Sequence, residues 1–173
     1  MSFLLKLEKL ERIVVKIEEV IVITLLLGLA TLQVTQVVFR YFLNIPLHWV
    51  DESSRFVFIF MIMIGAGLAT AKAAQFSIDF IKNAMPKTAR IIADILVRAG
   101  IVTFAIVLLR NGIRLAGMTS RQTTASLQLP YTFPYSSMPV GAVLILYHAL
   151  MGIPRQVQRV LRHEDEDASK DAQ

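Results

Sequence analysis

Hydrophobic residues along the chain gather into four long runs, which short charged segments separate. The runs cover about residues 20–39, 56–74, 91–109 and 131–153. A helix of roughly 20 apolar residues is long enough to cross the ~30 Å hydrocarbon core of a bilayer. The pattern therefore predicts an all-α membrane protein whose four transmembrane helices form one domain, residues 20–155.

The residues before the first run, 1–19, mix apolar and charged side chains. The apolar ones recur at the spacing of one helix face: Phe3, Leu7, Leu10, Val14 and Ile17. This spacing predicts an amphipathic helix that lies in the membrane surface. The alternative is a solvated extension of the first transmembrane helix.

Lysine and arginine are unevenly distributed between the segments that flank the runs. Most lie in residues 1–19, in the C-terminal tail and between the second and third runs. The other two connections hold only Arg40, Arg55, Arg110, Arg114 and Arg121. Because positive charge concentrates on the cytoplasmic side of a membrane protein, both termini are predicted in the cytoplasm. Residues 156–173 are then a charged cytoplasmic tail.

The composition supports a membrane location, since 55% of the residues are hydrophobic. The net charge of +5 does not indicate nucleic-acid binding, because the basic residues flank hydrophobic runs and form no stripe. Anionic membrane lipids are the expected partner of this charge. The chain has no cysteine, which excludes disulfides, thiol nucleophiles and cysteine-ligated metals.

Small residues in the second run are spaced four apart, notably Gly65 with Ala69 and Gly67 with Ala71. This spacing lets two helix backbones approach closely inside a membrane. These four residues are therefore predicted to pack against a neighbouring helix. The sequence leaves open whether that helix belongs to this chain or to another subunit.

Asp94 and Arg98 lie inside the third run, four residues apart on one helix face. Ionisable residues at membrane depth are costly and often functional. A local ion pair between them explains their presence. The alternative is an intramembrane contact with a partner subunit.

The connection between the first two runs, residues 40–56, holds the most specific local pattern in the chain. Trp49 is predicted to anchor at the headgroups. Asp51 and Glu52 fall in the first turn of the second helix, where the helix dipole favours negative charge, and Asp51 can reach Arg55. A capped helix with an aromatic belt explains this pattern structurally. The alternative is that Arg40, Trp49, Asp51, Glu52 and Arg55 dock a partner.

No motif indicates an enzyme, a cofactor or a metal site. The histidines are His48, His148 and His163. A haem-bearing membrane anchor would need two axial ligands, yet His48 and His148 are predicted near opposite membrane surfaces. A homo-oligomeric channel or transporter is the other alternative, because Gln33, Gln36, Asp94 and Arg98 supply some polar material within the runs.

Several short patterns occur in a characteristic order: Arg40-Tyr41, Asn44, Pro46, Trp49, Asp51-Glu52, Arg55, Gly65 to Ala73, Leu129-Pro130 and Met138-Pro139-Val140-Gly141. In this order and spacing, over about residues 15–155, the chain resembles the small membrane subunit, the DctQ family, of tripartite ATP-independent periplasmic (TRAP) transporters. It departs from the family pattern at Gln75, where many relatives have histidine, and at Tyr131–Ser137.

The resemblance implies a non-catalytic scaffold subunit without a cofactor, in the inner membrane of a bacterial cell. In this family a large multi-span subunit carries solute and sodium ions by an elevator movement, and a periplasmic binding protein delivers the solute. The solute is typically a C4-dicarboxylate or a sialic acid. The chain is accordingly expected to pair with the large subunit as a heterodimer and to meet the binding protein transiently.

Overall fold

The computed structural model describes the backbone of residues 2–82 and 87–152, and side chains within 7–72, 92–93 and 95–152. The predicted tail, residues 156–173, and the side chain of Asp94 lie outside this description. The named helices are α1 (Ser2–Phe42), α2 (His48–Lys82), α3 (Lys87–Met118) and α4 (Thr132–Tyr135). After Ser136 the chain continues as a helix over residues 137–152, termed the last helix below. Within the described backbone there is no β-strand, which confirms the all-α prediction.

Three segments are long and apolar enough to cross a membrane: His48–Lys72, Ile95–Met118 and Thr132–Gly152. They correspond to the second, third and fourth hydrophobic runs, and they confirm that this is a membrane protein. Residues 20–39 lie within α1 and carry no charged side chain. Their role as a fourth transmembrane segment remains a prediction.

The first helix, α1, runs over 41 residues without a break, a length of ~60 Å at 1.5 Å per residue. Residues 2–19 are therefore the beginning of one long helix, and a separate interfacial helix is not confirmed. Moreover, Glu11 and Glu18 are buried, whereas Leu10, Ile13 and Ile17 are about half exposed. Two glutamates of this segment thus meet the bundle, whereas Lys9, Arg12 and Lys16 are exposed together with the apolar residues just named.

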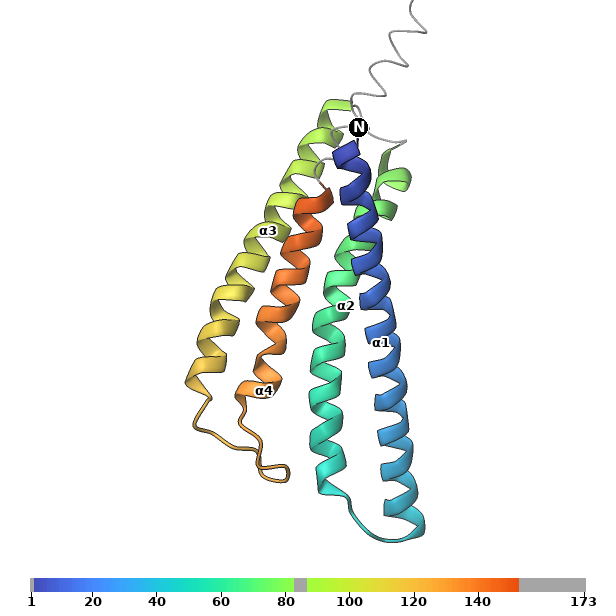
Figure 1. Cartoon of the computed structure of the whole chain (residues 1–173), viewed down its shortest axis with the longest axis vertical. Coiled ribbons are helices and arrows are strands. Elements are labelled where there is room, and N and C mark those ends of the chain that lie inside the picture. Colours follow the sequence, from blue (N-terminus) through green and yellow to red (C-terminus); the bar gives the residue numbers. More distant parts are fainter. Residues whose placement is uncertain (1, 83–86, 153–173) are drawn as a thin grey trace, which may run out of the picture.

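The helices run up and down between two ends of the molecule (Figure 1). Residues 43–47 and 119–131 form the loop end. At the opposite, terminal end, α1 begins and the last helix finishes. The helix α1 lies beside α2, and the last helix lies between α3 and the α1–α2 pair (Figure 1).

Three glycines let the last helix approach its neighbours. A Cβ atom added to Gly67 of α2 would lie 2.7 Å from the Cβ atom of Leu144. One added to Gly141 would lie 2.8 Å from both the Cβ atom and the carbonyl oxygen of Met63. On the other side, one added to Gly112 of α3 would lie 2.9 Å from a Cβ atom of the last helix. Such approaches allow extensive packing between helices in a membrane, where the hydrophobic effect does not drive helices together.

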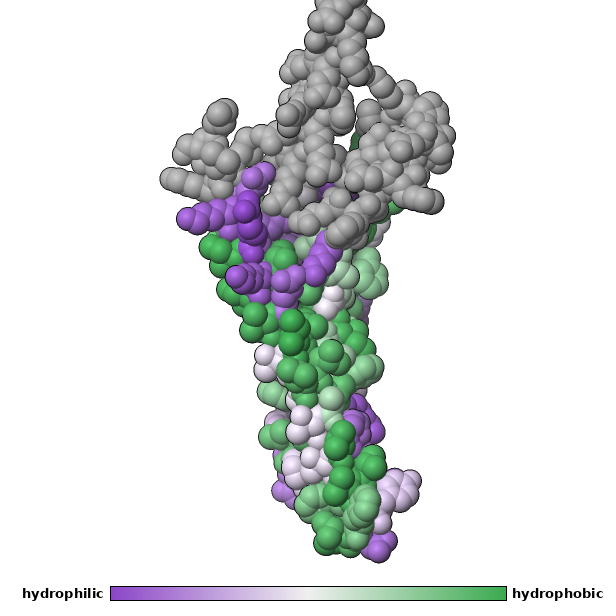
Figure 2. All heavy atoms as spheres, turned by 90° about the vertical axis from the view of Figure 1, so that its right-hand side faces the viewer, coloured by the Kyte–Doolittle hydropathy of each residue, from purple (hydrophilic) through white to green (hydrophobic). Residues whose placement is uncertain are grey.

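Large apolar side chains are exposed on every long helix, and Figure 2 shows a mainly hydrophobic surface over the middle of the α1 side. The threonines of α1 are compatible with that surface. The hydroxyls of Thr24, Thr31 and Thr35 each donate to the carbonyl four residues earlier, at 2.8 Å. Because α1 satisfies these hydroxyls itself, they need no partner elsewhere in the bundle.

Candidate functional site

At the loop end, α1 and α2 are joined by a hydrogen bond between side chains. The chain reverses through Asn44, which adopts a left-handed conformation at φ 55° that asparagine tolerates better than most residues. Pro46 then precedes α2, which begins at His48. Gln36 of α1 donates from Nε2 to Asp51 Oδ1 of α2. This bond fixes the first turn of α2 against α1.

The next carboxylate, Glu52, holds the tip of the loop that precedes α4. Glu52 Oε2 accepts hydrogen bonds from the backbone N–H groups of Ser126 at 3.1 Å and Leu127 at 2.7 Å. Behind this tip, buried Thr124 closes the loop: its N–H donates to Leu129 O at 2.9 Å, and its Oγ1 accepts from Leu129 N at 3.1 Å. Glu52 therefore connects α2 with a loop that is distant in sequence.

We expect Glu52→Ala to loosen this loop without unfolding the helices, because both loop amides lose their charged acceptor. Hydrogen bonds to a charged group contribute about 1.5–3 kcal/mol, and the half-buried position of Glu52 places the cost at the low end. Hydrogen exchange measured by mass spectrometry should accelerate in residues 119–131 and remain unchanged in α3. Glu52→Gln, which keeps an acceptor oxygen, should show a smaller effect; equal rates in all three proteins would contradict this role.

The other residues predicted at this end are exposed. Arg40 and Arg55 are exposed, and Trp49 is 47% exposed at the start of α2. Within the described part of the chain, no ion pair joins Asp51 to Arg55, although both occupy the same face of α2. Asp51 bonds to Gln36 instead, a partner that the local spacing does not reveal.

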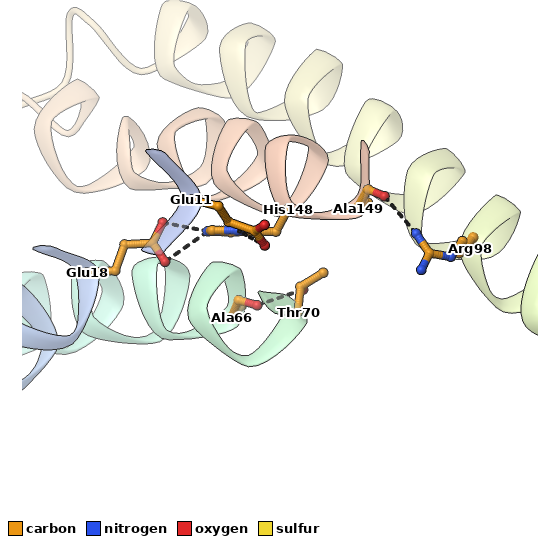
Figure 3. Close-up of polar contacts among 7 residues, drawn as sticks. All are labelled: Glu11, Glu18, Ala66, Thr70, Arg98, His148 and Ala149. Carbon is orange, nitrogen blue, oxygen red and sulfur yellow. Dashed lines mark hydrogen bonds and ion pairs between the residues drawn. The ribbon is translucent and has the colours of Figure 1, made fainter. Parts of the chain in front are cut away.

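At the terminal end, a buried histidine lies between two buried glutamates (Figure 3). His148 comes from the last helix, and Glu11 and Glu18 lie about two turns apart on α1. His148 Nε2 is 3.0 Å from both carboxylate oxygens of Glu18, and His148 Nδ1 is 4.0 Å from Glu11 Oε1. The three side chains are 0, 4 and 5% exposed. We call these three residues the Glu–His–Glu cluster.

The Glu–His–Glu cluster places an imidazole ring between two carboxylates inside the bundle. An imidazole that donates from Nε2 to Glu18 still presents its other ring nitrogen toward Glu11. A protonated ring would offer N–H groups to both carboxylates and balance part of their negative charge. The two carboxylates lie on opposite sides of the ring and therefore do not converge on one point. Accordingly, the described residues contain no group of three potential ligands that could hold a metal ion.

The sequence patterns point to neither glutamate. Glu11 and Glu18 lie seven residues apart, on one face of a helix, and that spacing is the signal that could have found them. The sequence marks His148 only as a candidate haem ligand or packed residue. His48 is exposed at the loop end, so the two histidines lie at opposite ends of the bundle and do not flank one haem within this chain. His163 lies outside the described residues.

A second contact at the terminal end involves Arg98 of α3. Its Nη1 donates to the carbonyl oxygen of Ala149 at 3.2 Å (Figure 3). The guanidinium also lies beside Gly152, where an added Cβ atom would be 2.7 Å from Nη1. Arg98 is thus directed against the last helix, and the small residue at position 152 provides its space.

The four small residues predicted to pack in α2 fall on different sides of the helix. Gly67 and Ala71 are buried, and Gly67 faces the last helix. Gly65 is half-buried with no atom within 4 Å of an added Cβ, and Ala69 is exposed. Within this chain, therefore, only one of the two pairs is enclosed.

The sequence is similar to a family of membrane transport proteins. The model of the DctQ component of tripartite ATP-independent periplasmic transporters matches residues 13–159. The sialic acid TRAP transporter small permease protein SiaQ of Vibrio cholerae serotype O1 is 24% identical over 146 residues, which are 84% of either chain. The isethionate TRAP transporter permease protein DctMQ of Oleidesulfovibrio alaskensis is 30% identical over 71% of this chain, and the sialic acid TRAP transporter permease protein SiaT of Haemophilus influenzae is 25% identical over 76%. The aligned region covers 21% of each of these two longer proteins.

Proposed function

Because the chain belongs to the DctQ component of the tripartite ATP-independent periplasmic transporters, we propose that it is the non-catalytic small permease subunit of a sodium-coupled transporter. The match to residues 13–159 confirms the resemblance on which this family assignment rests. The described helices offer packing faces and buried polar contacts. Solute and ion carriage belong, in this proposal, to a large subunit.

The observation that carries the proposal is the form of the longer relatives. In DctMQ and SiaT, a segment similar to this chain makes up about a fifth of a much longer permease. A segment that is joined to a permease in one protein and separate in another commonly acts beside that permease in both. This supports a heterodimer in which the chain scaffolds a large elevator-type subunit.

The chain is a protein of the bacterial inner membrane, and we propose that α1 provides its fourth transmembrane segment. The charge-free residues 20–39 are long enough for this role. Most lysines and arginines flank the terminal end, which supports cytoplasmic termini and a periplasmic loop end.

The transported solute is proposed from the relatives and from the family. Two relatives are named for sialic acid and one for isethionate. All of these solutes are organic acids, which supports an organic acid such as a sialic acid or a C4-dicarboxylate for this system. A periplasmic binding protein would deliver it at the loop end, where Arg40 and Trp49 are exposed.

For the contact with the large subunit, we propose the side of α2 that contains Gly65 and Ala69. These residues are spaced for close helix approach, and none of the described residues fills the space at Gly65. The packing of Arg98 against the last helix supports a mainly internal role for Arg98. The alternative from the sequence is that Asp94 and Arg98 contact the large subunit within the membrane. If Asp94→Ala and Arg98→Ala both leave assembly and uptake unchanged, that alternative is wrong.

Co-expression with the large subunit tests the function. We expect the two chains to co-purify in equal amounts and to take up solute only together with sodium and the binding protein. Gly65→Leu should reduce co-purification about tenfold or more, since overpacking a helix contact costs ~1–3 kcal/mol, while the isolated chain keeps its thermal stability. Gly117→Leu, at another open glycine, is the matched control. Solute transport by this chain alone in liposomes would overturn the proposal and favour a homo-oligomeric channel.

A further inference from the structure

A groove between α1 and α2 at the loop end has walls of two kinds. It is an open groove of about 400 Å³, a volume within the range of ligand sites. Polar Gln33, Asp51, Ser54 and Arg55 line one part, and apolar Leu29 and Phe58 line the other. The polar residues of α2 lie nearer its start than Phe58 does, so the groove changes from polar to apolar in the direction of the bilayer centre.

The polar part holds donors that the chain does not use. Ser54 is 3% exposed, and its buried Oγ has no hydrogen-bond partner. Throughout the described residues, Arg55 and Gln33 make neither a hydrogen bond nor an ion pair. A buried hydroxyl without a partner costs about 1–3 kcal/mol. Gln33 and Arg55 are exposed, so the buried Ser54 hydroxyl alone bears this cost. Together the three donors line one groove, which favours a ligand rich in acceptor oxygens.

One negative group stands beside these donors. Asp51 uses Oδ1 to accept the hydrogen bond from Gln36, and among the described contacts its other oxygen remains available. The groove therefore presents a guanidinium and a carboxylate four residues apart on α2. A ligand with an anionic and a cationic group at a short separation complements both charges.

The depth of the groove matches the headgroup region of a bilayer. Trp49, an interfacial residue type, is 47% exposed, and Arg55 lies six residues further along α2, ~9 Å deeper at 1.5 Å per residue. A long arginine side chain at that depth extends back toward the headgroups. Phe58, 46% exposed, then faces the acyl-chain region.

We propose that this groove binds one phospholipid with a primary ammonium headgroup, of the phosphatidylethanolamine class. Arg55 pairs with the phosphate, a geometry that guanidinium groups favour, with Ser54 and Gln33 as further donors. The free oxygen of Asp51 accepts the ammonium, and an acyl chain covers Leu29 and Phe58. The bound lipid thereby fills the space between α1 and α2 in the leaflet at the loop end, which is the periplasmic leaflet under the orientation proposed above.

Native mass spectrometry of the full chain tests this site. The protein is reconstituted in vesicles of phosphatidylethanolamine and phosphatidylglycerol (about 3:1, a bacterial-type mixture with anionic lipid), extracted in detergent and stripped gradually. We expect one phosphatidylethanolamine to remain after the other lipids have dissociated. Arg55→Gln should lower its occupancy about tenfold through the loss of a charge-assisted pair, and Arg114→Gln, exposed on α3, should leave it unchanged.

Two further arms distinguish the headgroup from a general affinity for phosphate. Asp51→Asn should reduce retention of phosphatidylethanolamine, whereas phosphatidylglycerol should dissociate as early as it does from the wild type. Vesicles of phosphatidylcholine and phosphatidylglycerol should yield no retained zwitterionic lipid, because a quaternary ammonium donates no hydrogen bond. Equal retention in wild type and Arg55→Gln would overturn the proposal. Release of the lipid on binding of the large subunit would also overturn the proposal, because the groove would then be a contact site for that protein.

Discussion

Replacing His148 by alanine should destabilise the protein severely. The substitution removes the imidazole that lies 3.0 Å from Glu18 and 4.0 Å from Glu11, and it leaves the buried Glu18 carboxylate facing a cavity. Removing one partner from a buried charged group costs about 3–5 kcal/mol, because the buried charge loses the pairing that offset its desolvation. We expect a markedly lower midpoint in thermal unfolding of the purified protein in detergent.

His48→Ala is the matched control, because His48 is exposed at the loop end and forms no described hydrogen bond or ion pair. It should leave the midpoint unchanged. The triple variant Glu11→Leu, Glu18→Leu, His148→Leu should recover much of the lost stability, since apolar replacement of a buried charged group is often neutral or stabilising. If His148→Ala unfolds at the same temperature as the wild type, the Glu–His–Glu cluster does not hold α1 against the last helix.

Gly141→Ala should give a smaller but still substantial loss of stability, through packing alone. The new methyl group would lie 2.8 Å from the Cβ atom and 2.8 Å from the carbonyl oxygen of Met63. Because one of these atoms belongs to the α2 backbone, a side-chain rotation cannot relieve the contact. Overpacking of this kind costs about 1–3 kcal/mol, even though alanine is the better helix former by ~1 kcal/mol. Thermal unfolding and gel filtration of the detergent-solubilised protein measure the effect.

Gly65→Ala provides the opposite case on α2. No atom lies within 4 Å of a Cβ atom added there, so the helix propensity of alanine is gained without a clash. The midpoint should rise slightly or remain unchanged in the isolated chain. A similar loss at Gly141 and Gly65 would show that the close approach of α2 and the last helix does not determine stability.

The hydrophobic runs in the sequence predict much of the helical architecture. Three of the four predicted runs coincide with helices that are long and apolar enough to cross a membrane. The limits of the helices were harder to predict, because polar residues at a helix end can still be helical. Thus α2 begins at His48, ahead of both the hydrophobic run at Phe56 and the predicted first turn at Asp51, and α1 continues through residues 2–19.

The polar contacts were less predictable, because they depend on which residues meet across helices. Local spacing suggested a pair between Asp51 and Arg55, whereas Asp51 bonds to Gln36 and leaves Arg55 in the groove. Similarly, the apolar spacing of residues 1–19 indicated that the charged residues faced water. In the folded protein, Glu11 and Glu18 face the last helix, where His148 Nε2 contacts Glu18 and His148 Nδ1 lies near Glu11.

An all-α membrane protein of the DctQ family can be predicted from the sequence, since the length and apolarity of each run are local properties and the family pattern consists of order and spacing. Which polar groups are enclosed and which are left open depends instead on contacts between helices. Burial depends on the neighbouring helix, and residues 130 positions apart, Glu18 and His148, become partners only when α1 and the last helix lie side by side.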